Sequence, residues 1–566
     1  GVTVLKGLLK KVHGVDLEEG AVELAAFSLC LALCDALEPE TIRASIKLFP
    51  LLAGKTLHHC CFFQAKEERL IKEPIGLVTG NPPFTSSLGT PAAERSYQRY
   101  ESMHGSLPDK QLAYLFLHEG MEMVAEGGAL CMLQQYNFLY NQQSLDFRRD
   151  FISKWDVREI LDFVSVRGLF QKGGADTKVI VVLAEAVKPA AGRRILHATF
   201  RRSGRADAEQ GFDIDYYDLH WLPRQLAVSN DGIWRADLLG GGRVLGFLDR
   251  LKTFRTLGQY AADQGWDFGE GFIEGQREVS RPASHIVGKA LLPSEALGPD
   301  GIDASAIVKA PPKPIEGPRS EKRFTPPILL VREQMDLPHA IWSKNYLTYK
   351  NQIVGFAAPK EHISRLNRVD KWLATEAPAL RAFTAGASVK LFTQKATTLS
   401  GADILALPYP EEGTLDLSDN ERVIVEDITD YYRDLIRLGE DSEALKEGGL
   451  PKIAAFAASF TRQINAIYGQ NPLRALKPYA WPGAICLPFV FGDGKVDWNG
   501  ADELKGKLDS LLHEQRGTTL HVTRIARIYH GSFIFLLKPE PLRYWLRSTA
   551  LRDADETLSD LRAQGF

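Results

Sequence analysis

A short motif, Asn81-Pro82-Pro83-Phe84, contains the residue types with the most specific chemistry in this chain. It follows the apolar run of residues 75–80, which has the pattern of a buried strand. An amide, two rigid prolines and an aromatic ring at the end of a strand can hold a planar base and polarise its amino nitrogen. Pro-Pro pairs also occur as simple stiff turns, because each ring fixes φ and removes a backbone donor. The motif therefore predicts a base-binding loop only together with its neighbours.

A candidate cofactor ligand lies upstream of this motif. Residues 12–16 have the pattern of a short strand that ends in Asp16, and a helix is expected after it. In a doubly wound α/β sheet, a carboxylate at the carboxyl end of a strand lies at the ligand crevice and can accept hydrogen bonds from two ribose hydroxyls. Asp16 is therefore a candidate, with Glu18 as its substitute. The alternative for Asp16 is a helix N-cap.

Strands and helices alternate downstream of the motif. The sequence predicts a helix over residues 111–124, a strand over 129–133, an Arg-containing helix over 144–154, and strands over 157–163 and 177–183. Strands that alternate with helices of this length indicate a largely parallel sheet. The predicted fold class of this part is α/β.

Residues from about 12 to 185 resemble the class I methyltransferase domain of N6-adenine DNA methyltransferases. The order is the gamma type of type IIG restriction-modification enzymes and related phage-defence methylases. The signals that carry the resemblance are Gly14-Val15-Asp16, the Asn-Pro-Pro-Phe motif, Glu126-Gly127-Gly128, and an Arg-containing helix that leads to Leu169-Phe170. The resemblance implies a class I methyltransferase (Rossmann-like) sheet, followed by an α+β target-recognition domain and a smaller C-terminal α+β region.

The resemblance also implies roles on the side of the base. Asn81 and the carbonyl of Pro82 would accept hydrogen bonds from the exocyclic amine of a flipped adenine. Phe84 and Phe170 would stack on the two faces of that base. A cytosine-N4 methylase stays open as an alternative, because the same motif can present either exocyclic amine.

The implied methyl donor is S-adenosylmethionine. Residues expected to hold it are Asp16, Leu17, Thr56 and Asn81. Lys55 stands where the family usually has an aspartate that receives the amine of the cofactor adenine, and lysine has donors but no acceptor. We expect the cofactor loop of the family, with the first strand, upstream of Gly1.

Two functions follow from these residues. The first is a site-specific adenine DNA methyltransferase in a restriction-modification or phage-defence system. The second is a methyltransferase-like DNA-recognition subunit of a defence complex with weak or no catalysis, which Lys55 favours. The expected partners are double-stranded DNA and subunits of such a complex.

The length of 566 residues predicts several domains. We expect the methyltransferase domain over residues 1–188, a connecting segment over 189–250, the target-recognition domain over 251–415 and a helical and α+β region over 416–566. The last region could form a partner interface. Six cysteines without regular spacing, no long apolar run and no visible signal peptide predict a cytoplasmic protein.

The net charge of −3 does not point to nucleic acid, but a local basic patch needs no global excess. Candidate DNA contacts are Arg148, Arg149, Lys350, Asn351 and Gln352, although charged clusters of this kind are more often solvated surface. No metal site is predicted. The consecutive residues 58–61, His-His-Cys-Cys, cannot easily converge on one tetrahedral ion.

Overall fold

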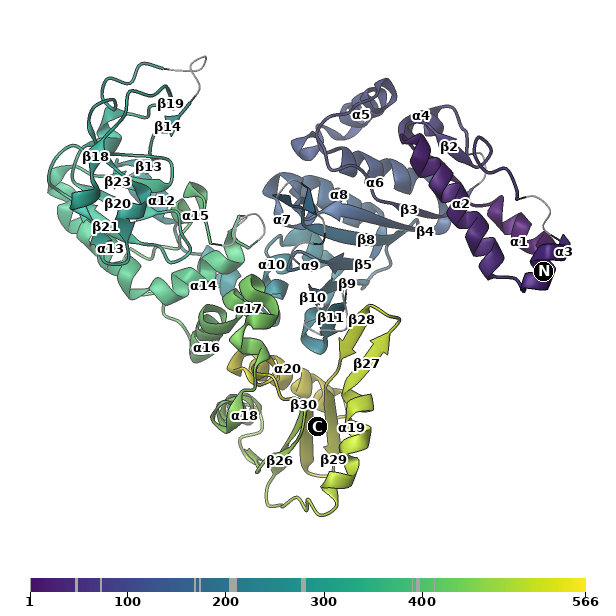
Figure 1. Ribbon diagram of the computed structural model, residues 1–566. Coiled ribbons are helices and arrows are strands. Elements are labelled where there is room, and N and C mark those ends of the chain that lie inside the picture. The colour runs from purple at the N-terminus through teal and green to yellow at the C-terminus, as the bar shows by residue number, and fades with distance from the viewer. Residues whose placement is uncertain are drawn as a thin grey trace. The chain divides into compact units, whose positions relative to one another are not determined.

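The computed structural model describes residues 2–566 except 46–48, 72–73, 167–168, 170, 173–174, 203–210, 276–280, 389, 393–396 and 412 (Figure 1). It confirms the predicted α/β class. The chain divides into two compact units. The first is Gly1–Phe138, Gln143–Arg158 and Val181–Ala191, and the second is Leu139–Gln142, Glu159–Ile180 and Gly192–Phe566. Among the described residues, no helix is both long and apolar enough to span a membrane.

The largest sheet has the strand order β12-β9-β5-β8-β4-β3. Its strands are β3 (Ile75–Gly80), β4 (Val124–Gln135), β5 (Asp156–Asp162), β8 (Val179–Glu185), β9 (Arg194–Thr199) and β12 (Leu219–Pro223). The pairs β3–β4 and β5–β9 are parallel, as the alternation of strands and helices predicts, and β12 joins β9 antiparallel. The Asn81 motif directly follows Gly80, so it lies at the carboxyl end of β3.

The first unit begins with a small parallel pair of strands. Its elements are α1 (Val2–Leu9), β1 (Gly14–Asp16), α2 (Glu19–Asp35), α3 (Pro39–Ser45), β2 (Leu57–His59) and α4 (Phe62–Glu67). In this pair Asp16 lies opposite His59. Helix α2 packs its Val22 and Leu33 against Leu57 of β2, so apolar burial holds the helix against this pair of strands.

The rest of the first unit places helices around β3 and β4. These helices are α5 (Pro91–His104), α6 (Leu112–Met123) and α8 (Leu145–Lys154), and the short α7 (Asn137–Tyr140) follows β4. The expected strand over residues 129–133 begins earlier, at Val124. Gly127 has a φ of 77°, and a Cβ on Gly128 would meet the Gly76 carbonyl oxygen at 2.8 Å. The glycine pair therefore lies inside the strand, where the backbones of β3 and β4 approach closely, and does not precede it.

The second unit contains the residues of the expected target-recognition domain. Its four-stranded sheet has the order β13-β23-β20-β21, from β13 (Asp267–Glu270), β20 (Ile328–Arg332), β21 (His339–Trp342) and β23 (Ile353–Ala357). Residues 347–356 have the apolar pattern of one strand, but the structure has β22 (Thr348–Tyr349) and β23 with a turn between them. Smaller strands are β14 (Ile273–Glu274), β15 (Ala290–Leu292), β16 (Leu297–Gly298), β17 (Gly301–Ile302), β18 (Val308–Lys309) and β19 (Ile315–Gly317).

Helices that precede and follow this sheet in the sequence share its core. They are α10 (Ile233–Leu238), α11 (Val244–Lys252), α12 (Leu257–Asp263), α13 (Ile363–Thr375), α14 (Ala377–Ala387), α15 (Gly401–Leu405), α16 (Asp419–Asp427) and α17 (Arg433–Leu438), whereas α9 (Arg224–Ser229) contacts β12. Their buried side chains, such as Leu248, Leu380 and Ile424, form one cluster with Val354 and Phe356 of β23. Residues on both sides of the expected 251–415 boundaries thus share one core.

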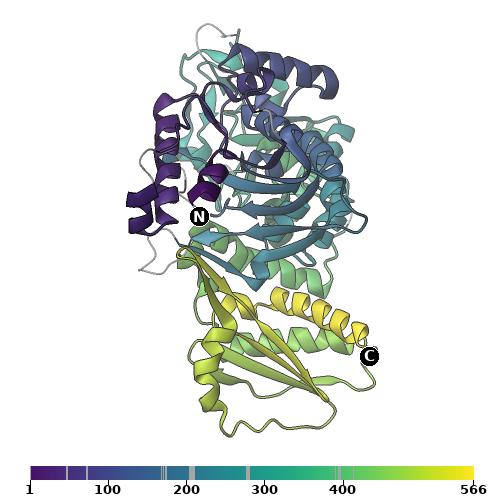
Figure 2. The same cartoon turned by 90° about the vertical axis from the view of Figure 1, so that its right-hand side faces the viewer.

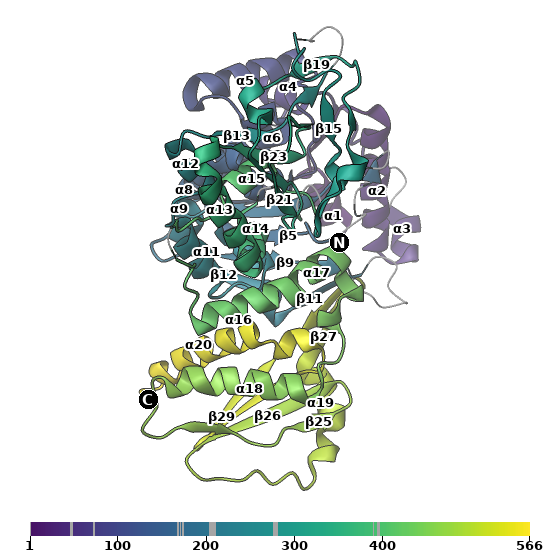
Figure 3. The same cartoon turned by 90° about the vertical axis from the view of Figure 1, so that its left-hand side faces the viewer.

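The C-terminal part of the second unit is a helix-covered antiparallel sheet. Its strands β24 (Leu473–Ala475), β26 (Ala484–Phe491), β29 (Ala526–His530) and β30 (Phe533–Pro539) have the order β24-β26-β30-β29, and β25 (Tyr479–Trp481) pairs with β26. Figure 3 shows α18 (Gly449–Asn465) and α20 (Arg547–Ala563) side by side, and Phe456 and Phe460 of α18 share a core with Leu536 of β30. Helix α19 is Lys505–Leu512.

A hairpin of β27 (His513–Arg516) and β28 (Leu520–Thr523) extends from this C-terminal part (Figure 2). Residues 518–538 have the sequence pattern of two strands, but the structure has β28, β29 and β30 there. The reason is tertiary: β28 pairs in parallel with β11 (Phe212–Asp215), and β10 (Arg201–Arg202) completes the sheet β10-β11-β28-β27.

Candidate functional site

The Asn81 motif forms an irregular loop between β3 and α5. Gly80, the last residue of β3, pairs with Met132 of β4. Asn81 is exposed, Pro82 is buried and Phe84 is half-buried. The amide is therefore open to a ligand, while the residue after it is anchored in the protein.

Three hydrogen bonds hold the loop behind the motif. The Leu112 N–H at the start of α6 donates to the Thr85 carbonyl at 2.9 Å. The Ser87 N–H donates to the Thr85 hydroxyl at 3.1 Å. The Thr90 hydroxyl caps α5 by accepting from the Ala93 N–H at 3.2 Å. The loop is thus held by hydrogen bonds at the starts of α5 and α6, so its backbone is preorganised for a ligand.

A buried carboxylate ties the helices of this loop together. Glu119 of α6 is 4% exposed. It accepts from the Ser96 hydroxyl of α5 at 2.6 Å and from Arg99 at 3.2 Å, and it forms an ion pair with Lys66 of α4. Burial raises the pKa of Glu119, but the hydrogen bonds from Lys66 and Ser96 outweigh it and hold the pKa below its ordinary value.

Replacing Glu119 with glutamine is expected to destabilise the protein by about 1–3 kcal/mol, because Lys66 loses its charged partner in a part-buried site. The lowered pKa means that Glu119 contributes stability above its unfolded pKa and loses it as the pH falls through the folded value. Urea unfolding at pH 7 and in acid measures both effects. Equal acid sensitivity of Glu119→Gln and wild type would contradict this assignment.

Asp16 lies at the carboxyl end of β1 and Leu17 follows it, whereas Thr56 precedes the first residue of β2 and Asn81 follows β3. Asp16 is exposed, and its Oδ1 accepts from the Glu18 N–H at 2.9 Å. The N-cap of α2 is Glu18, so Asp16 is not the N-cap residue. A cavity of about 390 Å³ opens beside this end of β1. Its walls are Glu19, Val22, Glu23, Ala53, Gly54, His58, His59, Cys60 and Leu70.

The carboxyl end of β1 fits the ribose of a nucleoside-containing cofactor, since Asp16 has acceptor oxygens there and a ligand-sized cavity lies beside it. Leu17 is 57% exposed. Thr56 is 9% exposed, and its hydroxyl has no hydrogen-bond partner within the described chain. Lys55 is exposed in the turn before β2, and its side chain has donors but no acceptor.

A family model matches the part of the chain that contains the carboxyl ends of β1 and β3. Residues 10–170 match the family described as the Eco57I restriction-modification methylase. These residues are an Eco57I-type restriction-modification methylase domain. The match includes Asp16 and the Asn81 motif, and it confirms the family that the sequence predicts for this region. No curated protein sequence matches the chain significantly.

Solved structures similar to the chain include restriction-modification proteins. The M protein of the type I restriction enzyme EcoKI is 17% identical, with 35% of this chain and 37% of that chain covered and a TM-score of 0.25. The type IIL enzyme MmeI in complex with DNA is 11% identical, with coverage of 74% and 57% and a TM-score of 0.42. A putative class I S-adenosylmethionine-dependent methyltransferase from Listeria monocytogenes is 19% identical, with coverage of 33% and 48% and a TM-score of 0.22. The chain covers less than two thirds of each.

The role of Phe170 as the second stacking ring stays a prediction, because Phe170 lies outside the described residues.

The His-His-Cys-Cys run of residues 58–61 contains side chains with separate partners. His59 Nε2 lies 3.0 Å from the Leu17 carbonyl oxygen, and Cys61 Sγ lies 3.1 Å from the Thr90 hydroxyl. The described residues hold no group of three His, Cys, Asp or Glu side chains suited to a metal.

The expected DNA contacts differ in their exposure. Arg148 on α8 is 1% exposed and donates to the Phe138 carbonyl at 2.6 Å, which leaves its guanidinium no surface for DNA in this conformation. Arg149 is partly exposed. Lys350 pairs with Glu274 at 2.8 Å, and Gln352 accepts from Ser294 at 2.8 Å. Asn351 is exposed in the same turn.

Sequence reasoning missed a buried network at the end of β5. His197 of β9 is fully buried, with Nε2 at 3.2 Å from Asp162 and Nδ1 at 2.8 Å from Asp237. The Tyr140 hydroxyl also donates to Asp162. These residues are far apart in sequence, so spacing could not reveal them. The one local signal is an aspartate at the end of an apolar strand.

Proposed function

We propose that the chain is a DNA methyltransferase that moves a methyl group from S-adenosylmethionine to the N6 amine of a flipped adenine, in a restriction-modification or phage-defence system. The observation that carries the proposal is the exposed Asn81 on a pinned loop at the carboxyl end of β3, inside the methylase domain. Double-stranded DNA would be the substrate.

The chemistry asked of the protein is modest. When bound, S-adenosylmethionine supplies a methyl group already activated by its sulfonium. The Asn81 amide oxygen and the Pro82 carbonyl would accept the two hydrogens of the amine, which favours a tetrahedral nitrogen with an accessible lone pair. Phe84 would stack on the extruded base, which offsets part of the cost of unstacking. As the nitrogen–methyl bond forms, the carbon–sulfur bond would break and neutral S-adenosylhomocysteine would leave, and the proton that the nitrogen loses would pass to solvent, so no strong general base is needed.

Asp16 would hold the ribose hydroxyls of the cofactor. Its replacement with alanine is expected to raise the Kd for S-adenosylmethionine by roughly 10–100-fold, because hydrogen bonds to a charged group contribute about 1.5–3 kcal/mol. Isothermal titration measures the change. The matched control is Glu38→Ala, an exposed acidic residue beyond the end of α2 that should bind the cofactor as wild type does. Unchanged binding by Asp16→Ala would remove Asp16 from the cofactor site.

A second function is a methyltransferase-like subunit that recognises DNA with little or no catalysis. The observation that favours it is Lys55, an exposed lysine at the sequence position where the resemblance implies an acceptor for the cofactor adenine. DNA binding without cofactor affinity is its distinguishing behaviour.

Transfer of labelled methyl groups to DNA, followed by digestion to nucleosides, tests both functions. N6-methyladenine is the expected product. N4-methylcytosine would overturn the adenine assignment but keep the enzyme. DNA binding with no transfer and no cofactor binding would support the recognition subunit.

A further inference from the structure

Helix α6 packs closely on β3 and β4, as Figure 1 shows. In the middle of the helix, a Cβ on Gly120 would lie 3.0 Å from Met132 Cε and 3.1 Å from Leu130 Cδ1, both on β4. Glycine at this position therefore allows the close approach. These contacts fix the middle of α6 but not its first turn, because the first N–H groups of a helix have no partner within it. The first turn depends on contacts from other elements.

One buried amide holds that first turn. Gln134, near the carboxyl end of β4, is fully buried. Its Nε2 donates to the Ala113 carbonyl of α6 at 3.1 Å and to the Leu133 carbonyl of its own strand at 2.8 Å. Both partners are carbonyl oxygens, so the nitrogen of the amide must face them. The Oε1 atom has no hydrogen-bond partner among the described residues, so the side chain joins β4 to α6 through its nitrogen alone.

The same turn of α6 holds the loop that follows Asn81. The N–H of Leu112, the first residue of α6, donates to the Thr85 carbonyl at 2.9 Å. The Thr85 N–H donates in turn to the Pro83 carbonyl at 3.2 Å. The segment between Asn81 and Thr85 contains two prolines, whose rings fix φ. A shift of the first turn of α6 would therefore reach Asn81, because this short stiff segment cannot absorb it.

We propose that Gln134 is a positioning residue for methyl transfer, which acts through the first turn of α6 on the loop that carries Asn81. The inference rests on the proposed function, in which Asn81 accepts the amine of the target base. All of these residues belong to the first compact unit. A displacement of about 1 Å in a reacting group can lower a rate by up to about 100-fold. Gln134 is fully buried, so its loss should affect the rate and not the affinity for cofactor or DNA.

Gln134→Met in the full chain tests the amide at nearly constant volume. Methionine has no N–H, so the hydrogen bond from β4 to the Ala113 carbonyl is lost while the packing is kept. We expect kcat to fall by about tenfold or more, with an unchanged Kd for S-adenosylmethionine and for DNA and a urea midpoint close to that of wild type. Gln98→Met, the same substitution at an exposed position of α5, is the matched control and should behave as wild type.

A second pair of variants tests the contact between α6 and the loop. Leu112→Pro removes the N–H that donates to the Thr85 carbonyl, and proline is tolerated at the first position of a helix. The preceding Gln111 has φ −67° and ψ 116°, which a residue before proline can adopt. Leu112→Ala also loses the leucine side chain but keeps the N–H. We expect the kcat of Leu112→Pro to lie about tenfold or more below that of Leu112→Ala.

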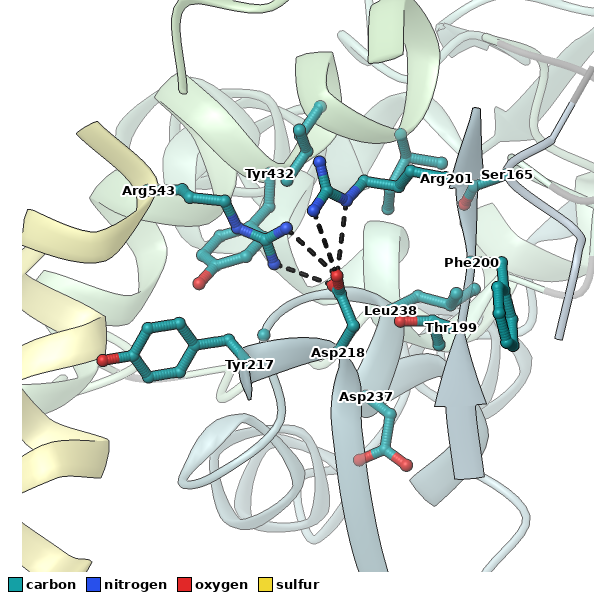
Figure 4. Close-up of a pocket in the computed structure, with 13 residues that line it drawn as sticks. Ser165, Thr199, Phe200, Arg201, Tyr217, Asp218, Asp237, Leu238, Tyr432 and Arg543 are labelled. Atoms are coloured by element: carbon teal, nitrogen blue, oxygen red, sulfur yellow. Dashed lines mark hydrogen bonds and ion pairs between the residues drawn. The ribbon is translucent and has the colours of Figure 1, made fainter. Parts of the chain in front are cut away.

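A variant of the second unit measures what a loss of stability alone does to the rate. Figure 4 shows the guanidinium groups of Arg201 and Arg543 directed at Asp218, with N–O distances of 3.2 and 2.8 Å. Arg201→Met removes one of these ion pairs and should lower the urea midpoint. The kcat per folded molecule should stay at the wild-type value.

Three results would overturn the inference while leaving the proposed function in place. The first is a wild-type kcat in Gln134→Met. The second is a fall in its kcat no larger than its fall in folded protein measured by circular dichroism, as expected for Arg201→Met. The third is an equal kcat in Leu112→Pro and Leu112→Ala. Absence of transfer by wild type itself would overturn the proposed function as well, and the parallel wild-type assay distinguishes that outcome.

Discussion

Asn81→Ala is expected to lower kcat for methyl transfer by roughly 10²–10³-fold, the effect of removing one preorganised hydrogen-bonding group from a reacting centre. The side chain is exposed, so stability should change by no more than about 0.5 kcal/mol. DNA affinity should change little, because phosphate contacts dominate it. Initial rates with labelled S-adenosylmethionine, taken with binding by fluorescence anisotropy, separate these quantities.

Two further variants sharpen this test. Asn81→Asp keeps an acceptor at the same position and is expected to retain more activity than Asn81→Ala. Ser86→Ala removes an exposed polar side chain from the same loop and should behave as wild type. If Asn81→Ala and Ser86→Ala transferred methyl groups equally well, Asn81 would not act on the amine.

His197→Ala is expected to destabilise the second unit by about 3–5 kcal/mol, the cost of leaving buried charge without its partner. Removal of the ring leaves the Asp162 and Asp237 carboxylates buried, and Asp162 also anchors the Val164 N–H. Urea unfolding followed by tryptophan fluorescence is a suitable measurement, since the Trp234 ring centroid lies 5.2 Å from that of His197. The exposed His530 provides the control variant His530→Ala.

The same network predicts a loss of stability in alkali. Burial lowers the pKa of His197, but hydrogen bonds and charges from Asp162 and Asp237 outweigh it and raise the pKa to about 9. The unfolded value is lower, so the contribution is full below about pH 6.5 and is lost as the pH rises through the folded value. His220, 3.4 Å from Asp237, does not share this behaviour because burial lowers its pKa to about 4. A wild-type stability that stays level from about pH 6 to about pH 10 would refute the charged bridge.

Local pattern was enough to predict the elements of the methylase domain. The helix expected over residues 111–124 is α6 (Leu112–Met123), and the strand expected over 157–163 is β5 (Asp156–Asp162). Such elements bury one face, so their apolar period appears in a short window. The predicted start of the next strand, after the glycines at 127–128, was wrong. These glycines lie inside β4, where a Cβ on Gly128 would meet the Gly76 carbonyl oxygen of β3, and a short sequence window does not contain both strands.

The sequence by itself determined the family, the fold class and the candidate base-side residues, because Asn81, Pro82 and Phe84 lie within one short motif and their chemistry depends on their types and their strand-end position. Only the tertiary structure decided which distant segments meet within each unit. In the first unit Glu119 joins three helices, and in the second unit His197 bridges two aspartates and Leu520 packs against a cluster that contains Val166. These contacts depend on burial and on pairing between distant segments, and neither leaves a periodic signal in the sequence.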